Sequence, residues 1–230
     1  MALRFQRLFL TLAAALLLAL QAGCTSLFFY PDHQVYLTPD RLDLAYEDVW
    51  LTTADGERLH GWWLPAQGEP RGHVYFLHGN AQNISSHILN VAWLPAEGYD
   101  VFMIDYRASE WVPREEQPAL NGVILDGTFS GFRGIAREKL GNFWLTWPLQ
   151  IPLSWTVPDD YEGLDHIHRI SPVPVMVIHS IRDGIIPFHH GLALYEAAGE
   201  PKTFLRTDTG HGGTFILPEY QRALLRFMEE

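Results

Sequence analysis

Residues 99–127 read YDVFMIDYRASEWVPREEQPALNGVILDG, and this stretch decides how a sheet can be built. It holds two mainly apolar runs, at 99–106 and 122–125, that are typical of buried strands. Residues 107–121 separate the two runs, and this link is polar and contains two prolines. A parallel crossover takes about a dozen residues or more. The link is therefore long enough for one crossover, but too short for an additional strand with its own helix.

The remainder of the chain alternates strand and helix patterns. Two β-rich runs, at 44–52 and 58–64, flank an Asp-Gly pair and predict a hairpin. Further strands are predicted at 73–77, 174–179 and 202–206, and helices at 83–97, 187–198 and 218–230. Continuous apolar strands that alternate with helices indicate a mostly parallel sheet covered on both faces. We therefore predict an α/β fold whose opening hairpin forms an antiparallel edge.

Composition excludes several classes of protein. A chain of 230 residues with 47% hydrophobic content is expected to form one domain with a sizeable core. The net charge of −11 argues against nucleic-acid binding, which would require a basic stripe. The sequence shows neither a dinucleotide fingerprint nor a phosphate-binding glycine loop, and the histidine pairs at 166/168 and 189/190 lack metal-site spacing. We predict no cofactor and no metal, and interpret these histidines as surface or cap residues.

The first 24 residues resemble a bacterial lipoprotein signal. Two arginines precede an apolar run at 8–20, and Ala-Gly-Cys follows. The run is too short for a comfortable membrane span and is typical of a secretory signal peptide. By the resemblance, Cys24, which is the only cysteine, would be lipidated and would tether the protein to a membrane of the bacterial envelope. A plain signal peptide or an N-terminal membrane anchor is the alternative. The predicted division is a signal peptide at 1–23, an anchor and linker at 24–43, and a folded domain at 44–230.

An inserted cap of short helices is predicted at about 131–160. Phe143, Trp144, Trp147 and Trp155 lie close together there, without a clean period. Three interpretations remain open for these apolar residues. They could pack against the edge of the sheet, form a lid over a substrate pocket, or contact the membrane surface.

Three polar signals fall at the ends of predicted strands, where active sites lie in open α/β sheets. His78-Gly79-Asn80-Ala81 follows the strand at 73–77, and its turn leaves backbone N–H groups free to face an oxyanion. Asp183 follows the strand at 174–179, and His211 follows the last strand. An acid followed by a histidine in this order suits a base that is oriented by a carboxylate.

With these residues, the chain resembles an α/β-hydrolase of the serine aminopeptidase-like (S33-type) group, whose bacterial members include hydrolase lipoproteins. The matching stretches are VYFLHGN, GYDVFMIDYR, GVILDGTFS, PVPVMVIHSIRDGIIP and TDTGHGG. The resemblance implies that Asp183 is the triad acid, that His211 is the base, and that the N–H of Asn80 or Ala81 forms half of the oxyanion hole. It also implies hydrolysis of an ester, thioester or amide through an acyl-serine. As partners we expect a small acyl substrate or an apolar ligand, and we expect a monomer unless a gap in the sheet drives association.

The nucleophile that this family requires is missing from the sequence. The family places Gly-x-Ser-x-Gly on a sharp turn after a central strand, and no serine of this chain lies in that frame. The missing strand, elbow and helices would need roughly 50 residues, since one βαβ unit takes about 30. Ser109 and Ser130 are weak substitutes without an elbow. We predict an α/β-hydrolase sheet that lacks its central nucleophile-bearing strand, through an internal deletion, a frameshift or a mis-assembled gene.

Loss of a central strand has an energetic consequence. Two strand edges would be left with unpaired backbone groups, each costing about 1–3 kcal/mol when buried. The two edges either close up and pair with each other, or leave a gap that promotes self-association. Two functions remain open for such a chain. It is either a hydrolase with impaired catalysis, or a membrane-anchored lipoprotein that binds an apolar ligand through its Trp-rich cap.

Overall fold

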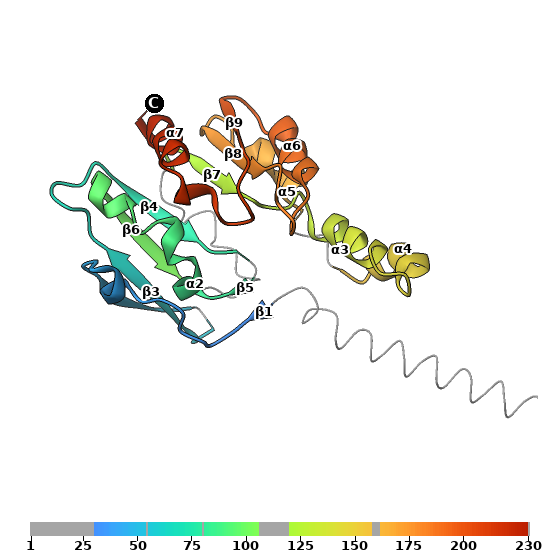
Figure 1. Cartoon of the computed structure of the whole chain (residues 1–230), viewed down its shortest axis with the longest axis horizontal. Coiled ribbons are helices and arrows are strands. Elements are labelled where there is room, and N and C mark those ends of the chain that lie inside the picture. The colour runs from blue at the N-terminus through green and yellow to red at the C-terminus, as the bar shows by residue number, and fades with distance from the viewer. Residues whose placement is uncertain (1–29, 54, 80, 106–119, 158–161, 230) are drawn as a thin grey trace, which may run out of the picture. The chain divides into compact units, whose positions relative to one another are not determined.

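The computed structural model describes residues 30–53, 55–79, 81–105, 120–157 and 162–229. The chain forms two compact units (Figure 1). One unit, which we call the sheet unit, comprises Pro31–Ser130 and Gly163–Glu230, and the other comprises Met1–Tyr30 and Gly131–Glu162. Within the described part of the chain, no helix has the length and apolar character needed to span a membrane.

The first sheet of the sheet unit has four strands, in the order β2-β3-β6-β4. Their bounds are Glu47–Thr52 for β2, Arg58–Leu64 for β3, Gly72–Leu77 for β4 and Tyr99–Ile104 for β6. Strands β2 and β3 pair antiparallel, with Thr52 opposite Arg58, which confirms the predicted hairpin. Strand β6 pairs antiparallel with β3 on one side and parallel with β4 on the other. The hairpin therefore forms one edge of this sheet and β4 forms the other.

A second, separate sheet contains three parallel strands, in the order β7-β8-β9. Their bounds are Val123–Asp126 for β7, Val175–Ser180 for β8 and Lys202–Thr207 for β9. Within the described residues, β4 and β7 do not pair, and each is the last strand of its own sheet. The α/β class is therefore confirmed, whereas the strands form two separate sheets, with β4 and β7 each at an unpaired edge. The two edges have not closed up by pairing with each other.

Burial follows this division closely. Every residue of β8 is buried, and so are all residues of β6 except Phe102. Strand β4 instead alternates between partly buried and exposed positions, and Tyr75 and Leu77 keep 48% and 54% of their side-chain surface accessible. No residue of β7 is fully buried. The strands with a neighbour on each side are thus covered, and those at the break between the sheets are not.

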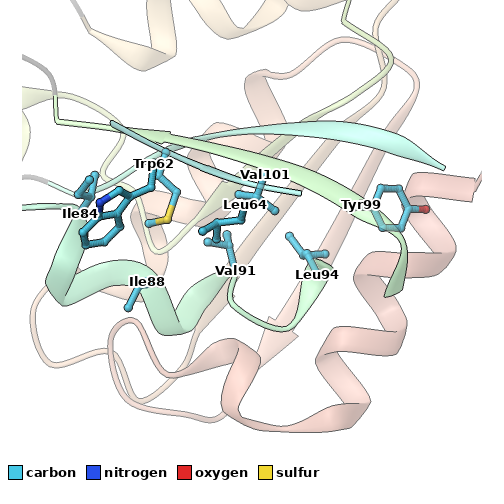
Figure 2. Close-up of a cluster of buried hydrophobic side chains, with 9 residues drawn as sticks. Trp62, Leu64, Ile84, Ile88, Val91, Leu94, Tyr99 and Val101 are labelled. Atoms are coloured by element: carbon cyan, nitrogen blue, oxygen red, sulfur yellow. The ribbon is translucent and has the colours of Figure 1, made fainter. Parts of the chain in front are cut away.

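The larger hydrophobic core lies against β3 and β6 (Figure 2). Its buried members are Trp62, Leu64, Ile84, Ile88, Val91, Leu94, Tyr99, Val101 and Met103. Several of these come from the segment predicted as one helix at 83–97, and that prediction was wrong in one respect. The segment is broken into a short α-helix α2 (Ile84–His87) and two 3-10 turns, η3 (Ile88–Asn90) and η4 (Leu94–Glu97). The second turn begins beside Pro95, whose ring cannot continue an α-helix, and Gly98 ends it with φ of 86°.

The remaining described elements of the sheet unit connect or cover the strands. They are η2 (Pro39–Leu42), β5 (Ala81–Gln82), α5 (Gly163–His166), η7 (Ile167–Ile170), α6 (Phe188–Ala197), η8 (Thr214–Ile216) and α7 (Pro218–Glu229). A two-residue strand, β1 (Tyr30–Pro31), precedes them. Helix α7 packs on the cores of both sheets. Leu225 and Met228 contact the core at β3 and β6, while Leu224, Phe227 and again Met228 contact the core at β8.

The described part of the other unit is built from short helices. It contains α3 (Phe132–Gly141), η6 (Trp147–Leu149) and α4 (Gln150–Ser154), in the region predicted as a cap. The Nε of Arg137 donates to the hydroxyl of Ser154 at 3.3 Å, and the hydroxyl of Thr146 donates to the carbonyl of Leu140 at 2.6 Å. These bonds hold the helices to one another.

Candidate active site

Asp183 and His211 come together at the carboxyl ends of β8 and β9. The Nδ1 of His211 lies 2.7 Å from Oδ2 of Asp183. The other carboxylate oxygen, Oδ1, accepts the N–H groups of Ile185 and Ile186, each at 2.8 Å. The Asp183 side chain is 1% exposed, whereas that of His211 is 32% exposed. A fixed carboxylate therefore orients an imidazole that remains open to solvent.

The charge state of this pair follows from its contacts. Burial alone would raise the pKa of Asp183, but the hydrogen bonds from His211 and from the two amides lower that pKa below its ordinary value. Asp183 is thus an anion that accepts a hydrogen bond from the Nδ1–H group of His211. This tautomer leaves Nε2 of His211 as the unprotonated nitrogen, which is the arrangement of a general base.

Gly127, directly after β7, lies against the Asp183–His211 pair. A Cβ atom at this position would stand 3.5 Å from both Cε1 and Nδ1 of the imidazole and 3.6 Å from Oδ2 of Asp183. Its φ of 59° also favours glycine. The preceding residue, Asp126, accepts a hydrogen bond from the hydroxyl of Thr214 at 3.0 Å. Asp126 is partly open to solvent, but its carboxyl is largely shielded from water by the protein. This desolvation disfavours the charged form and raises the pKa of Asp126 to about 6.

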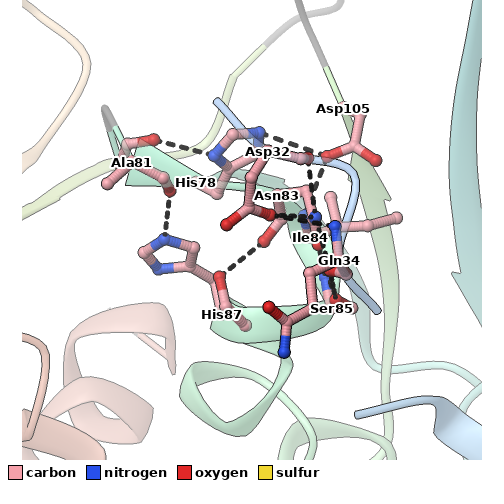
Figure 3. A network of polar contacts seen from close by, with 11 residues as sticks. Asp32, Gln34, His78, Ala81, Asn83, Ile84, Ser85, His87 and Asp105 are labelled. Carbon is pink, nitrogen blue, oxygen red and sulfur yellow. Dashed lines mark hydrogen bonds and ion pairs between the residues drawn. The ribbon is translucent and has the colours of Figure 1, made fainter. Parts of the chain in front are cut away.

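A second polar network lies at the carboxyl ends of β4 and β6 (Figure 3). Oδ1 of Asp105 accepts the N–H of Ile84 at 2.8 Å and lies 3.4 Å from Nε2 of His78. The Nε2 of His87 donates to the carbonyl of Ala81 at 3.1 Å. Burial lowers the pKa of His87, which favours its neutral form. The network fixes the turn after β4, where the oxyanion hole was predicted.

Within this network, Asn83 joins the start of α2 to the chain before the first sheet. Its side-chain oxygen accepts the N–H of Ser85 at 3.0 Å and caps the helix. Its side-chain nitrogen donates to the carbonyls of Asp32 and Gln34, at 3.0 and 2.9 Å. The helix start is thereby held beside the predicted oxyanion turn.

The predicted site residues fall into three groups. The structure brings Asp183 and His211 into contact. Ala81 is described, and its carbonyl is bonded to His87. Asn80, Ser109 and the proposed lipid attachment residue Cys24 lie outside the described residues.

Ser130, a weak substitute nucleophile in the sequence, is bonded to another residue. Its hydroxyl donates to Nδ1 of His190 at 2.7 Å, and its N–H points to the same nitrogen at 3.2 Å. Ser130 is 8% exposed and His190 is 2% exposed. Among the described residues, the only hydrogen-bond partner of the His211 ring is Asp183.

Sequence reasoning missed several polar residues of this region, and interpreted His190 wrongly. His190 is buried rather than a surface or cap residue, because its side chain is hydrogen-bonded inside the protein to Ser130, after β7. Asp105 and Asp126 were not singled out, although both stand at the carboxyl ends of strands. Asp183 was identified because active-site residues lie at such strand ends. Applying that rule to every strand would have found them.

One cavity of the sheet unit is lined mainly by apolar residues. A cavity of about 280 Å³ is lined by Leu42, Leu44, Leu89, Ala92, Trp93, Phe215 and Gln221, none of which belongs to the Asp183–His211 pair.

The fold and this pair define the class of protein. An esterase of Pyrococcus furiosus superposes with a TM-score of 0.60 and 18% identity, covering 86% of this chain and 95% of the esterase. The alpha/beta hydrolase domain-containing protein WAV2 of Arabidopsis thaliana is 39% identical over 93 residues, which cover 39% of this chain and 29% of WAV2. The protein has the α/β-hydrolase fold.

The particular family follows from a longer alignment. YfhR of Escherichia coli O157:H7 is 30% identical over 235 residues, covering 80% of this chain and 78% of YfhR. This chain belongs to the same family as YfhR. No family model matches the sequence.

Proposed function

We propose that the protein is a lipid-anchored member of the serine hydrolase group in which the acid–base pair is retained but no serine is positioned to form an acyl-enzyme. One observation carries the proposal. His211 is bonded to Asp183 at 2.7 Å, while Ser130, the described serine nearest in sequence to the missing elbow, is bonded to His190 instead. The S33-type subclass and an ester, thioester or amide substrate remain part of this proposal.

The break between β4 and β7 supports the loss of a segment. In an α/β-hydrolase sheet, the strand that carries the nucleophile would stand between these two strands. The alignment with YfhR runs over 235 positions but covers 80% of this 230-residue chain, which is about 184 residues. About 51 alignment positions, the difference of 235 and 184, therefore have no residue here. That difference agrees with the roughly 50 residues that a strand, an elbow and their helices require.

The chemistry left to the site is general-base catalysis. Nε2 of His211 can take a proton from water, and Asp183 stabilises the imidazolium that forms. Without a nucleophilic serine the reaction loses the covalent step that divides a difficult hydrolysis into two easier ones. We therefore expect slow hydrolysis of activated esters and no acyl-enzyme.

The decisive experiment treats the full chain with a fluorophosphonate probe and with p-nitrophenyl acetate. We expect no stoichiometric labelling, and slow ester hydrolysis that falls further in His211→Ala. Urea unfolding of the same preparation shows whether the inert chain is folded, because a cooperative transition excludes simple misfolding. Stoichiometric labelling of one serine that His211→Ala abolishes would falsify the proposal.

The anchor has its own test. Cys24→Ser should abolish incorporation of radioactive palmitate by a bacterial host, while Ser109→Ala leaves it unchanged. Equal incorporation by both variants contradicts lipidation at Cys24.

A second candidate function is that of a non-catalytic lipoprotein that binds an apolar ligand. The exposed tryptophans of the cap favour it. Saturable binding of a fatty acid, lost when these tryptophans are replaced, would support this candidate.

A further inference from the structure

The helical unit at 131–162 exposes an unusual amount of apolar surface. The side chains of Trp144, Trp147 and Trp155 are 78%, 61% and 64% exposed. Four further large apolar residues of the same segment are between 51% and 58% exposed, namely Phe143, Leu145, Leu149 and Ile151. Single exposed apolar residues are ordinary, but a cluster of this kind marks an interaction site.

The composition of this segment indicates the kind of partner. No charged residue occurs from Phe143 to Val157. Protein–protein contact surfaces usually carry a charged or polar rim and enrich arginine. Tryptophan beside leucine and isoleucine without charge is instead typical of the boundary between lipid headgroups and acyl chains. The segment is therefore suited to a bilayer surface.

The charges around the segment agree with this partner. Of the four charged residues between 131 and 157, Arg133, Arg137 and Lys139 are cationic and Glu138 is anionic, so this stretch carries +2. The whole chain carries −11. The stretch at 131–157 is thus more positive than the chain as a whole. The acids Asp159, Asp160 and Glu162 follow the patch rather than interrupt it.

We propose that residues 143–157 form a membrane-contacting surface, in which Trp144, Trp147 and Trp155 insert at the headgroup boundary of a phospholipid bilayer. The inference goes beyond the proposed function, and it uses the proposed anchor at Cys24 only as a reason for a nearby bilayer. The surface lies on a segment with no catalytic residue. Its contact with lipid is therefore independent of hydrolysis.

The test reconstitutes the full chain in phosphatidylcholine vesicles, with or without bromine on the acyl chains, and follows tryptophan fluorescence. Bromine quenches only tryptophans that reach the acyl region. We expect the combined variant Trp144→Ser, Trp147→Ser, Trp155→Ser to lose roughly half or more of the bromolipid quenching, as interfacial tryptophans should. Trp50→Ser is the matched control, because Trp50 is 54% exposed but lies on β2. It should leave the quenching unchanged.

A second variant keeps every tryptophan in place. Ile151 is 51% exposed, so Ile151→Glu should not disturb packing, yet it places a charge in the contact surface. We expect it to reduce the quenching of the remaining cap tryptophans. Equal quenching in the wild type and in both cap variants overturns the proposal. So does strong protection of the cap tryptophans from aqueous acrylamide combined with no bromolipid quenching, which is the result expected of a lid closed on the rest of the protein.

The variant Cys24→Ser distinguishes membrane contact by the cap surface from membrane contact through the lipid anchor. If this variant loses palmitate labelling but keeps the bromolipid quenching of the cap, the surface contacts lipid by itself. If the cap variants lose the quenching but keep palmitate labelling, the lipid contact depends on the cap and not only on the anchor.

Discussion

Strands β4 and β8 show how much of a strand's environment comes from its neighbours. Both are six residues long, largely apolar, and parallel to an adjacent strand. Strand β8 lies between β7 and β9, and all of its residues are buried. Among the described strands, β4 pairs with β6 alone, and half of its positions are exposed. An apolar run is sufficient to form a strand, but a missing neighbour leaves part of that strand in water.

The largest expected effect tests the covered side of this comparison. Ile178 in β8 is 0% exposed. Replacing it in Ile178→Ala leaves a cavity, so the free energy of unfolding should fall by about 2–5 kcal/mol. Leu77→Ala on β4 is the matched control, and because Leu77 is 54% exposed it should cost less than about 1 kcal/mol. Urea unfolding measures both free energies. Equal losses in the two variants would contradict the conclusion that β8 is buried and β4 is partly exposed.

The next effect concerns the loop after β8. Asp183→Asn weakens the bond to His211 and should lower the free energy of unfolding by about 1–3 kcal/mol at neutral pH. The pKa of Asp183 is lower in the folded protein than in the unfolded chain, so its stabilisation is complete above the unfolded value of about 3.9. That stabilisation is lost as the pH falls through the folded value. Unfolding curves between pH 7 and pH 2 should therefore converge for wild type and variant at the acidic end, and a constant difference contradicts the prediction.

A smaller effect is expected at the turn after β7. Ser130→Ala removes the 2.7 Å hydrogen bond to His190, although the N–H of residue 130 still points to the same nitrogen. The free energy of unfolding should fall by about 1 kcal/mol, a typical value for one buried hydrogen bond. Ester hydrolysis should not change. A loss of hydrolysis without a loss of stability would instead identify Ser130 as a nucleophile.

The smallest effect tests the open side of the comparison. Tyr75→Lys on β4 changes a side chain that is 48% exposed and whose ring stacks on Phe102. The free energy of unfolding should fall by less than about 1 kcal/mol, mainly through loss of this stacking. A charge on an unpaired edge hinders pairing with another chain, so self-association in sedimentation velocity should decrease. A large destabilisation would mean that this face of β4 is covered.

The strands and their order along the chain could be predicted because apolar runs and turn residues are local signals. The contact between Asp183 and His211 could be predicted as well, since both follow parallel strands whose carboxyl ends meet at one edge. The broken helix at 83–97 could not, because apolar spacing alone does not distinguish one helix from successive short turns. The burial of His190 could not be predicted either, since an adjacent pair of histidines does not show which one faces a sheet. Whether β4 and β7 pair with each other could not be predicted, because it depends on tertiary packing and not on the local sequence pattern.

Helix α7 has a consequence for how the molecule folds. Within the described residues, β4 and β7 do not pair, so the two sheets are not joined to each other there. Side chains of α7 therefore supply much of the coupling between the two sheets, namely Leu224, Leu225, Phe227 and Met228. An ion pair between Arg71, just before β4, and Glu229 adds to it. Because α7 follows every strand in the chain, the halves emerge from the ribosome before the helix that joins them. The coupling that α7 supplies can therefore form only after both sheets have been synthesised.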